Sequence, residues 1–110
     1  NDFAADKTRS IPEDDRQAYT AAYAAPGRMR AGWAYFASFI QTSKDFAGLA
    51  RTKLRMPVLA IGGEKSMGDV LGRQTKLVAT DATVVVLKDA GHWIMEERPE
   101  ETMDALVKFL

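Results

Sequence analysis

The sequence predicts an α/β fold in which a helical first half precedes a second half that reads strand, helix, strand, helix. Two uninterrupted apolar runs, at residues 58–61 and 84–87, are typical of strands buried on both faces of a parallel sheet. A segment with helical spacing separates them, so the strands should be parallel, adjacent or nearly adjacent in the sheet, and joined by a right-handed crossover. Residues 1–55 show helical patterns and no strand alternation, and we expect them to form a unit separate from residues 56–110.

Composition excludes several classes of function. The 110 residues include 15 basic and 15 acidic side chains, so the formal net charge is zero and there is no basic field for nucleic acid or an anionic membrane. The sequence has no cysteine, which excludes disulfides, thiol nucleophiles and cysteine-based zinc sites. No apolar run approaches the length of about 18 residues that a spanning helix needs. We expect a cytoplasmic protein that needs no cofactor. Because it opens on Asn1 rather than Met, we expect a fragment or a processed product.

Three helices are expected in the first half. Ser10 and Glu13 have the spacing of a capping box, with a proline early in the first turn, and predict a helix to about residue 25. The next helix, over residues 28–39, carries a wide apolar stripe. That stripe fits either a helix packed on two sides or one wall of an apolar cavity. Ser43 predicts the cap of a third helix over residues 44–53.

His92, the only histidine of the chain, stands at a position where chemistry is common. It follows the second apolar run and a glycine turn, just beyond the carboxyl end of the expected strand. A parallel crossover brings the loop at residues 62–69 to the same edge of the sheet. That loop lacks the spacing of both glycine-rich nucleotide-binding motifs, so we reject nucleotide binding. His92 is therefore the candidate general base, and the alternative is a turn or capping residue satisfied by the backbone.

A nucleophilic mechanism also needs a nucleophile and an acid that orients the base. A strand-to-helix nucleophile elbow, of the pattern G-x-[SD]-x-G, is absent from the 110 residues. Ser66 follows a glycine turn but lacks the flanking glycine of the elbow, so we do not take it as the nucleophile. Glu64 and Asp69 lie in the same loop and are candidate acids.

Three motifs carry a resemblance to a known family. Residues 55–66 (RMPVLAIGGEKS), 90–93 (AGHW) and 96–99 (EERP) resemble the C-terminal half of the epoxide hydrolase and haloalkane dehalogenase branch of the α/β-hydrolases. Residues 27–36 (GRMRAGWAYF) are similar to the last long helix of that branch's helical cap. The resemblance covers nearly the whole chain but only the last part of a full-length member. It implies that the fold is the C-terminal part of an α/β-hydrolase.

The resemblance also implies roles for the two halves. Residues 1–55 would be a helical cap or lid segment, and residues 56–110 the C-terminal part of the hydrolase core. His92 would be the base that activates water. The nucleophile, an Asp in this branch and a Ser in esterases, would lie upstream of this chain. Ser66 stands where the family's acid usually falls, and a serine has no carboxylate to serve as that acid. The acid would then lie after an earlier strand upstream of this chain, as in one subgroup, or at Asp69, or at Glu64.

The cap helix of the family faces the substrate, which here would be a small apolar organic molecule. The residues expected to line its site are aromatic: Trp33, Tyr35, Phe36, Phe39 and Trp93. In epoxide hydrolases a cap tyrosine donates a hydrogen bond to the epoxide oxygen. Phe36 holds that position here and has no donor. Tyr35 is the nearest phenol, offset by about 100° on an ideal helix, and we expect it to lie nearest the site.

The expected function is hydrolysis of the epoxide hydrolase type. The alternatives are a haloalkane or haloacid dehalogenase, a serine esterase on the same fold, and a binding or structural fragment without catalysis. The expected partner is the N-terminal half of the hydrolase, as a missing segment or a separate chain, and a homodimer stays open. Neither nucleic acid nor membrane is expected as a partner, and no metal site is predicted.

Overall fold

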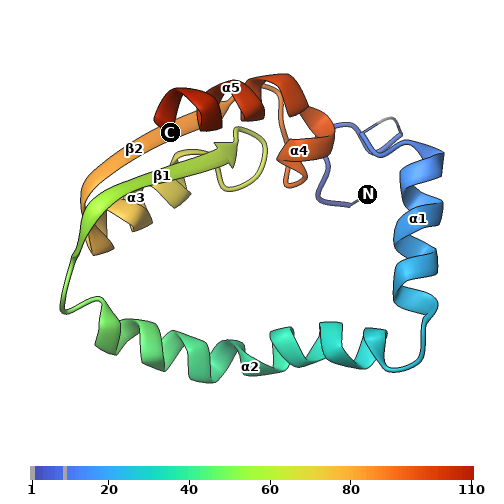
Figure 1. The fold of residues 1–110 in the computed structure, drawn as a ribbon, viewed down its shortest axis with the longest axis horizontal. Coiled ribbons are helices and arrows are strands. Elements are labelled where there is room, and N and C mark those ends of the chain that lie inside the picture. The colour runs from blue at the N-terminus through green and yellow to red at the C-terminus, as the bar shows by residue number, and fades with distance from the viewer. Residues whose placement is uncertain (1, 9) are drawn as a thin grey trace. The chain divides into compact units, whose positions relative to one another are not determined.

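The computed structural model describes residues 2–8 and 10–110, which form two compact units. Residues 12–51 make a helical unit, and residues 52–110 make a sheet unit together with the segment that ends at residue 11. Figure 1 shows the elements in chain order: α1 (Glu13–Ala24), α2 (Arg28–Leu49), β1 (Leu54–Gly63), α3 (Gly68–Val78), β2 (Ala79–Leu87), α4 (Ile94–Glu97) and α5 (Pro99–Phe109). Among the helices described, none combines the length and apolar character needed to cross a membrane.

The sheet of the described residues consists of β1 and β2, which are parallel as the sequence predicts. Leu59 pairs with Thr83, and Gly63 pairs with Leu87 at the carboxyl end. Both strands begin earlier than the apolar runs indicate, because residues of lower hydrophobicity still pair. The register is irregular between Leu54 and Pro57, where the proline has no N–H to donate.

Helices α3 and α5 cover opposite faces of this sheet (Figure 1). Gly72 of α3 is buried against Val84 of β2, and the contact leaves no room for a Cβ atom. The core of this unit is small, and its buried apolar side chains are Ala4, Ala60, Ala79, Leu87 and Ala90. Apart from Leu87, the branched residues of the two apolar runs are only partly covered. Val86, for example, keeps 42% of its surface exposed.

The helical unit differs from the expectation at two caps. The capping box was a wrong prediction: Pro12 caps α1 without a side-chain hydrogen bond, and the Ser10 hydroxyl bonds within the sheet unit instead. The expected break near Ser43 is also wrong, since α2 runs on to Leu49. Inside this helix the Gln41 amide donates to the Asp45 carboxylate at 2.8 Å, one turn apart, and bridges the place of the expected break.

The segment that ends at residue 11 groups with the strands and not with the helices. The last helix of the helical unit, α2, ends at Leu49, and β1 begins at Leu54. That the helical unit serves as a cap stays a prediction.

Candidate active site

The two loops that leave the carboxyl ends of β1 and β2 meet at one edge of the sheet, as the parallel arrangement predicts. The Glu64 N–H donates to the Leu87 carbonyl at 2.9 Å, and the Lys65 N–H donates to the Ala90 carbonyl at 2.8 Å. Gly63 lies so close to the Ala90 and Gly91 carbonyls that a Cβ at this position would overlap them. The loops thus share backbone contacts that only glycine permits at residue 63.

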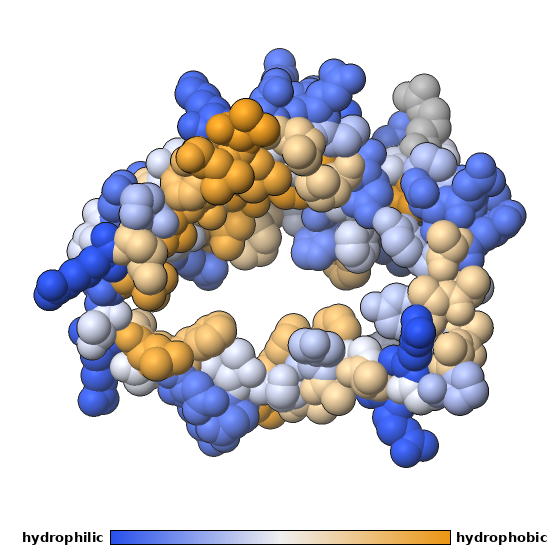
Figure 2. All heavy atoms as spheres, in the orientation of Figure 1, coloured by the Kyte–Doolittle hydropathy of each residue, from blue (hydrophilic) through white to orange (hydrophobic). Residues whose placement is uncertain are grey.

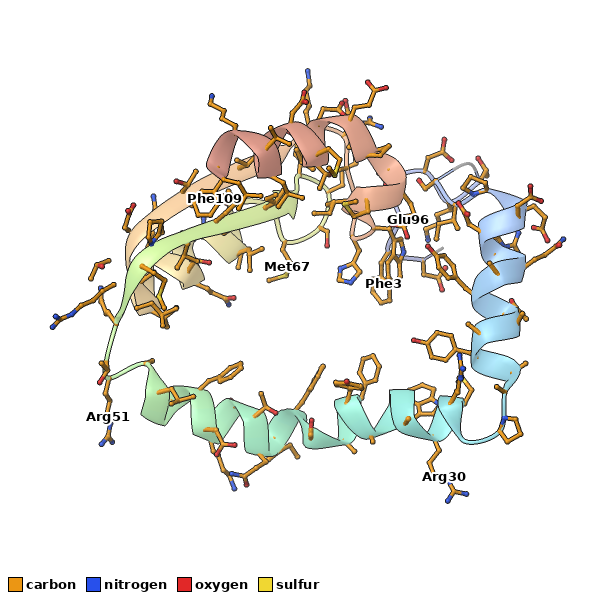
Figure 3. The ribbon with its side chains drawn as sticks, viewed as in Figure 1. Phe3, Arg30, Arg51, Met67, Glu96 and Phe109 are labelled. Atoms are coloured by element: carbon orange, nitrogen blue, oxygen red, sulfur yellow. The ribbon has the colours of Figure 1, made fainter. Side chains whose placement is uncertain are left out.

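His92 is exposed at this edge, and its backbone is held from the N-terminal segment. The His92 N–H donates to the Phe3 carbonyl at 2.9 Å. The Phe3 ring lies tilted against the imidazole at 6.0 Å between centroids, and the Trp93 ring meets it edge-on at 4.8 Å. Figure 3 labels Phe3, where the N-terminal segment runs beside α4. Within the described residues neither imidazole nitrogen makes a hydrogen bond, so both remain available for a substrate, a water or an acid.

Glu97 is the residue of this edge that the sequence did not identify. Its carboxylate is buried, with 9% exposure, and accepts four hydrogen bonds. Oε2 accepts from the N–H of Ala5 at 2.7 Å, the N–H of Gly91 at 3.1 Å and the Ser10 hydroxyl at 3.3 Å, and Oε1 accepts from the N–H of Trp93 at 3.1 Å. Burial raises the pKa of Glu97, but the hydrogen bonds outweigh burial and hold the pKa below its ordinary value of 4.5.

The turn before His92 has a strained residue with several restraints. Asp89 has a φ of 53°, in the left-handed region that few residues other than glycine adopt. Its N–H donates to Glu64 Oε2 at 3.0 Å, and its carboxylate pairs with Lys65 Nζ at 3.0 Å. The hydrogen bond and charge of Lys65 hold the pKa of Asp89 below its ordinary value of 3.8. Arg98 also donates to the carbonyl of Asp89, at 3.4 Å.

The two candidate acids are Glu64 in the β1–α3 loop and Asp69, which lies in the first turn of α3 and not in the loop as expected, and both are engaged elsewhere. Glu64 accepts the Asp89 N–H, and Asp69 pairs with Arg73 one turn along α3. In the part of the chain that the structure describes, no hydrogen bond or ion pair joins either carboxylate to His92. Asp69 as acid therefore stays a prediction without a contact to support it.

The predicted substrate-binding aromatics of the helical unit lie on α2. Trp33, Tyr35 and Phe36 line an apolar groove of about 770 Å³, which Tyr23 of α1 also lines. The Phe36 ring contacts Trp33 at 5.7 Å and Phe39 at 5.3 Å between centroids. The groove is a feature of the helical unit alone, whereas Trp93 belongs to the sheet unit. Substrate contact by these residues stays a prediction.

Comparison with known proteins identifies homologues of the whole chain, although no protein-family model matches it. The chain is 29% identical over 97 residues to the soluble epoxide hydrolase of Corynebacterium sp. strain C12, a match that covers 88% of this chain and 34% of the relative. The solved epoxide hydrolase CorEH aligns with a TM-score of 0.88 and 27% identity, over 98% of this chain and 38% of that one. The Cif epoxide hydrolase of Acinetobacter nosocomialis aligns with a TM-score of 0.84 and 27% identity, over 98% and 35%.

The chain therefore spans about a third of the length of the Corynebacterium relative. Both solved structures align with 98% of this chain, which includes the helical unit and the sheet unit. The resemblance drawn from the motifs and the predicted fold class are both confirmed. The chain is a homologue of the epoxide hydrolases and Cif-like α/β-hydrolases, and its fold is the C-terminal part of an α/β-hydrolase.

Proposed function

We propose that this chain belongs to an epoxide hydrolase-like enzyme in which His92 is the general base. The observation that carries the proposal is the place of His92 at the carboxyl edge of a parallel sheet, in a chain homologous to epoxide hydrolases. Its imidazole is exposed, and its nitrogens make no hydrogen bond to the residues that the structure describes. Ligands and catalytic groups collect at this edge in open α/β sheets. The Phe3 and Trp93 rings beside the imidazole make its surroundings apolar, which suits a small apolar substrate.

The reaction has two steps. An Asp carboxylate outside these 110 residues attacks an epoxide carbon, the carbon–oxygen bond of the ring breaks, and the ring oxygen takes a proton. The product of this step is a hydroxyalkyl ester. His92 then takes a proton from a water molecule as that water attacks the ester carbonyl. When the tetrahedral intermediate collapses, the diol oxygen leaves with the remaining proton of the attacking water, and the carboxylate is restored. The proton on His92 returns to solvent, and the group that protonated the ring oxygen regains its proton from solvent.

Two further groups complete the proposed mechanism. The acid that orients His92 lies outside these residues or is Asp69, which would first have to leave Arg73. Tyr35 supplies the proton to the ring oxygen, since Phe36 has no donor. Tyr35 is 75% exposed on α2 and lines the apolar groove, which leaves its hydroxyl accessible to a substrate.

The sheet unit needs a covering partner in this proposal. Figure 2 shows apolar surface over α5. Val107 of this helix is 70% exposed, and Leu110, directly after the helix, is 98% exposed. Exposure of this kind marks a surface that another element covers. The N-terminal half of the hydrolase, which would also bring the nucleophile, is the partner that we propose, in a cytoplasmic protein.

The test is His92→Gln in the enzyme that carries this chain together with the nucleophile. Asp attack needs no base, so an ester should accumulate and the intact protein should gain the full mass of the epoxide. A haloalkane substrate would instead add its mass less that of the hydrogen halide. A serine esterase would accumulate no adduct, because Ser must lose a proton to attack.

Ser66→Ala is the matched control on the same edge and should keep wild-type turnover. Wild-type turnover in the His92→Gln enzyme would remove His92 from the mechanism. It would favour the alternative in which this chain contributes binding or structure without a catalytic group.

A further inference from the structure

Glu97 joins two segments that meet around the candidate base, the loop that carries His92 and the N-terminal segment. Its donors are the N–H groups of Gly91 and Trp93, which flank His92, the N–H of Ala5, and the hydroxyl of Ser10. Three of these donors are backbone groups, which cannot reverse into acceptors. The site around this side chain therefore accepts a carboxylate and no other residue type of its size.

The same segments hold the imidazole. The His92 N–H donates to the Phe3 carbonyl, and the Phe3 ring lies against the imidazole. Ala5, two residues beyond Phe3, is fixed by Glu97 at 2.7 Å. Glu97 thus restrains the loop from both sides of His92 and, through Ala5, the segment that supplies the ring beside it.

We infer that Glu97 is a positioning residue, whose buried carboxylate ties the backbone on both sides of His92 to the N-terminal segment and so fixes the direction of the imidazole. A hydrogen bond from a backbone N–H to a carboxylate is stronger than one to a neutral acceptor, and here three such bonds converge. Charge at residue 97, and not only volume, is what holds the loop. Only the kinetic part of the test below rests on the function proposed above.

Glu97→Gln is the informative substitution because it keeps the size of the side chain. Its amide offers one acceptor oxygen, and its NH2 group must face either the Trp93 N–H or the donors at Oε2. In either orientation the new NH2 group faces at least one N–H or O–H donor and loses the hydrogen bond that the carboxylate oxygen accepted there. Glu100→Gln is the matched control: it makes the same chemical change at an exposed residue in the first turn of α5.

The first readout is the imidazole itself. His92 is the only histidine of the sequence, so its ring signals in a proton–carbon NMR spectrum of this chain need no further assignment. In Glu97→Gln we expect these signals to shift and the Phe3–His92 cross-peak to be lost, with both unchanged in Glu100→Gln. If Glu97→Gln is less stable but keeps the wild-type imidazole signals and the cross-peak, Glu97 is merely structural and the inference is wrong.

The second readout is kinetic, in the enzyme that carries the nucleophile. Displacing a base by about 1 Å typically lowers the rate about a hundredfold, so kcat should fall at least about tenfold. Because His92 acts after the ester has formed, KM should fall in proportion and kcat/KM should stay within about twofold. The covalent intermediate should accumulate. An unchanged kcat would contradict the inference. If His92→Gln keeps full turnover while the imidazole still shifts in Glu97→Gln, the proposed function fails and the positioning role stands.

A titration of the wild-type protein decides the question if Glu97→Gln does not fold. As Glu97 takes up a proton, the amide signals of Ala5, Gly91 and Trp93 should move together, and the ring signals of Phe3 should follow at the same pH. Amide signals that move while the Phe3 ring signals stay fixed would overturn the inference.

Discussion

Gly91→Ala should separate the N-terminal segment from the loop that carries His92. A Cβ at this residue would lie 2.6 Å from the Phe3 carbonyl oxygen and 2.7 Å from the Ala4 carbonyl carbon, closer than such atoms approach in proteins. Both neighbours are backbone atoms, so no side-chain rotation relieves the overlap. One of the two segments must move.

The cost follows from the two ways in which the protein can respond. Compressing the contact is a case of overpacking, which typically costs about 1–3 kcal/mol. Detaching the segment loses the bond from His92 to Phe3, worth about 1 kcal/mol, and the bond from Ala5 to Glu97, worth about 1.5–3 kcal/mol because its acceptor is charged. The protein takes the cheaper route, so we expect a loss of about 1–3 kcal/mol in the free energy of unfolding.

The assay is urea unfolding of the substituted and wild-type proteins, with the Phe3–His92 cross-peak as a local probe. Gly48→Ala is the control, because a Cβ there meets nothing within 4 Å inside a helical stretch. It should be neutral or stabilising by up to about 1 kcal/mol. Full stability of Gly91→Ala together with a retained cross-peak would refute the steric reasoning.

Two further predictions concern the packing and the pH dependence of the sheet unit. Gly72→Ala should destabilise the protein by about 1–3 kcal/mol, since the new methyl group overlaps Val84, and adding Val84→Ala should recover part of the loss. Urea unfolding of the two single variants and the double variant measures this coupling, and purely additive effects would contradict the prediction. Because the pKa of Glu97 is lowered on folding, its carboxylate stabilises the folded state fully above pH 4.5, and this contribution is lost as the pH falls through the folded-state pKa. Between about pH 6 and pH 3 the stability of Glu97→Gln should therefore fall less steeply than that of the wild type. Equal slopes would show that Glu97 is not the group responsible.

The framework of the sheet unit was predictable because its signals lie in side chains. The apolar runs at 58–61 and 84–87 give the strands, and the helical spacing between them gives the crossover and hence the parallel pairing. The place of His92 at the carboxyl edge follows from these elements alone. The single helix α2 was not predictable in the same way, because Ser43 is as compatible with a cap as with a helix interior.

The contacts that complete the site were invisible to sequence patterns because they are made by backbone groups. The Phe3 carbonyl and the Ala5 N–H would be present with almost any side chain at these residues. Glu97 stands beside Glu96, and periodicity does not tell which of two adjacent acids is buried. A clue was available in Gly91 next to His92, since a glycine there is compatible with a second backbone passing close by.

The hydrogen bond from Ala5 to Glu97 joins residues 92 positions apart, and this separation orders the assembly of the site. The two strands pair over a much shorter separation, as with Leu59 and Thr83, and that unit can form from local chain. Closing the longer loop costs about 1 kcal/mol more in chain entropy. The N-terminal segment is therefore expected to dock after the sheet has formed and to be among the first parts to open in the native state. The direction of the His92 imidazole would then be set last, when Phe3 and Ala5 dock on the loop that carries His92.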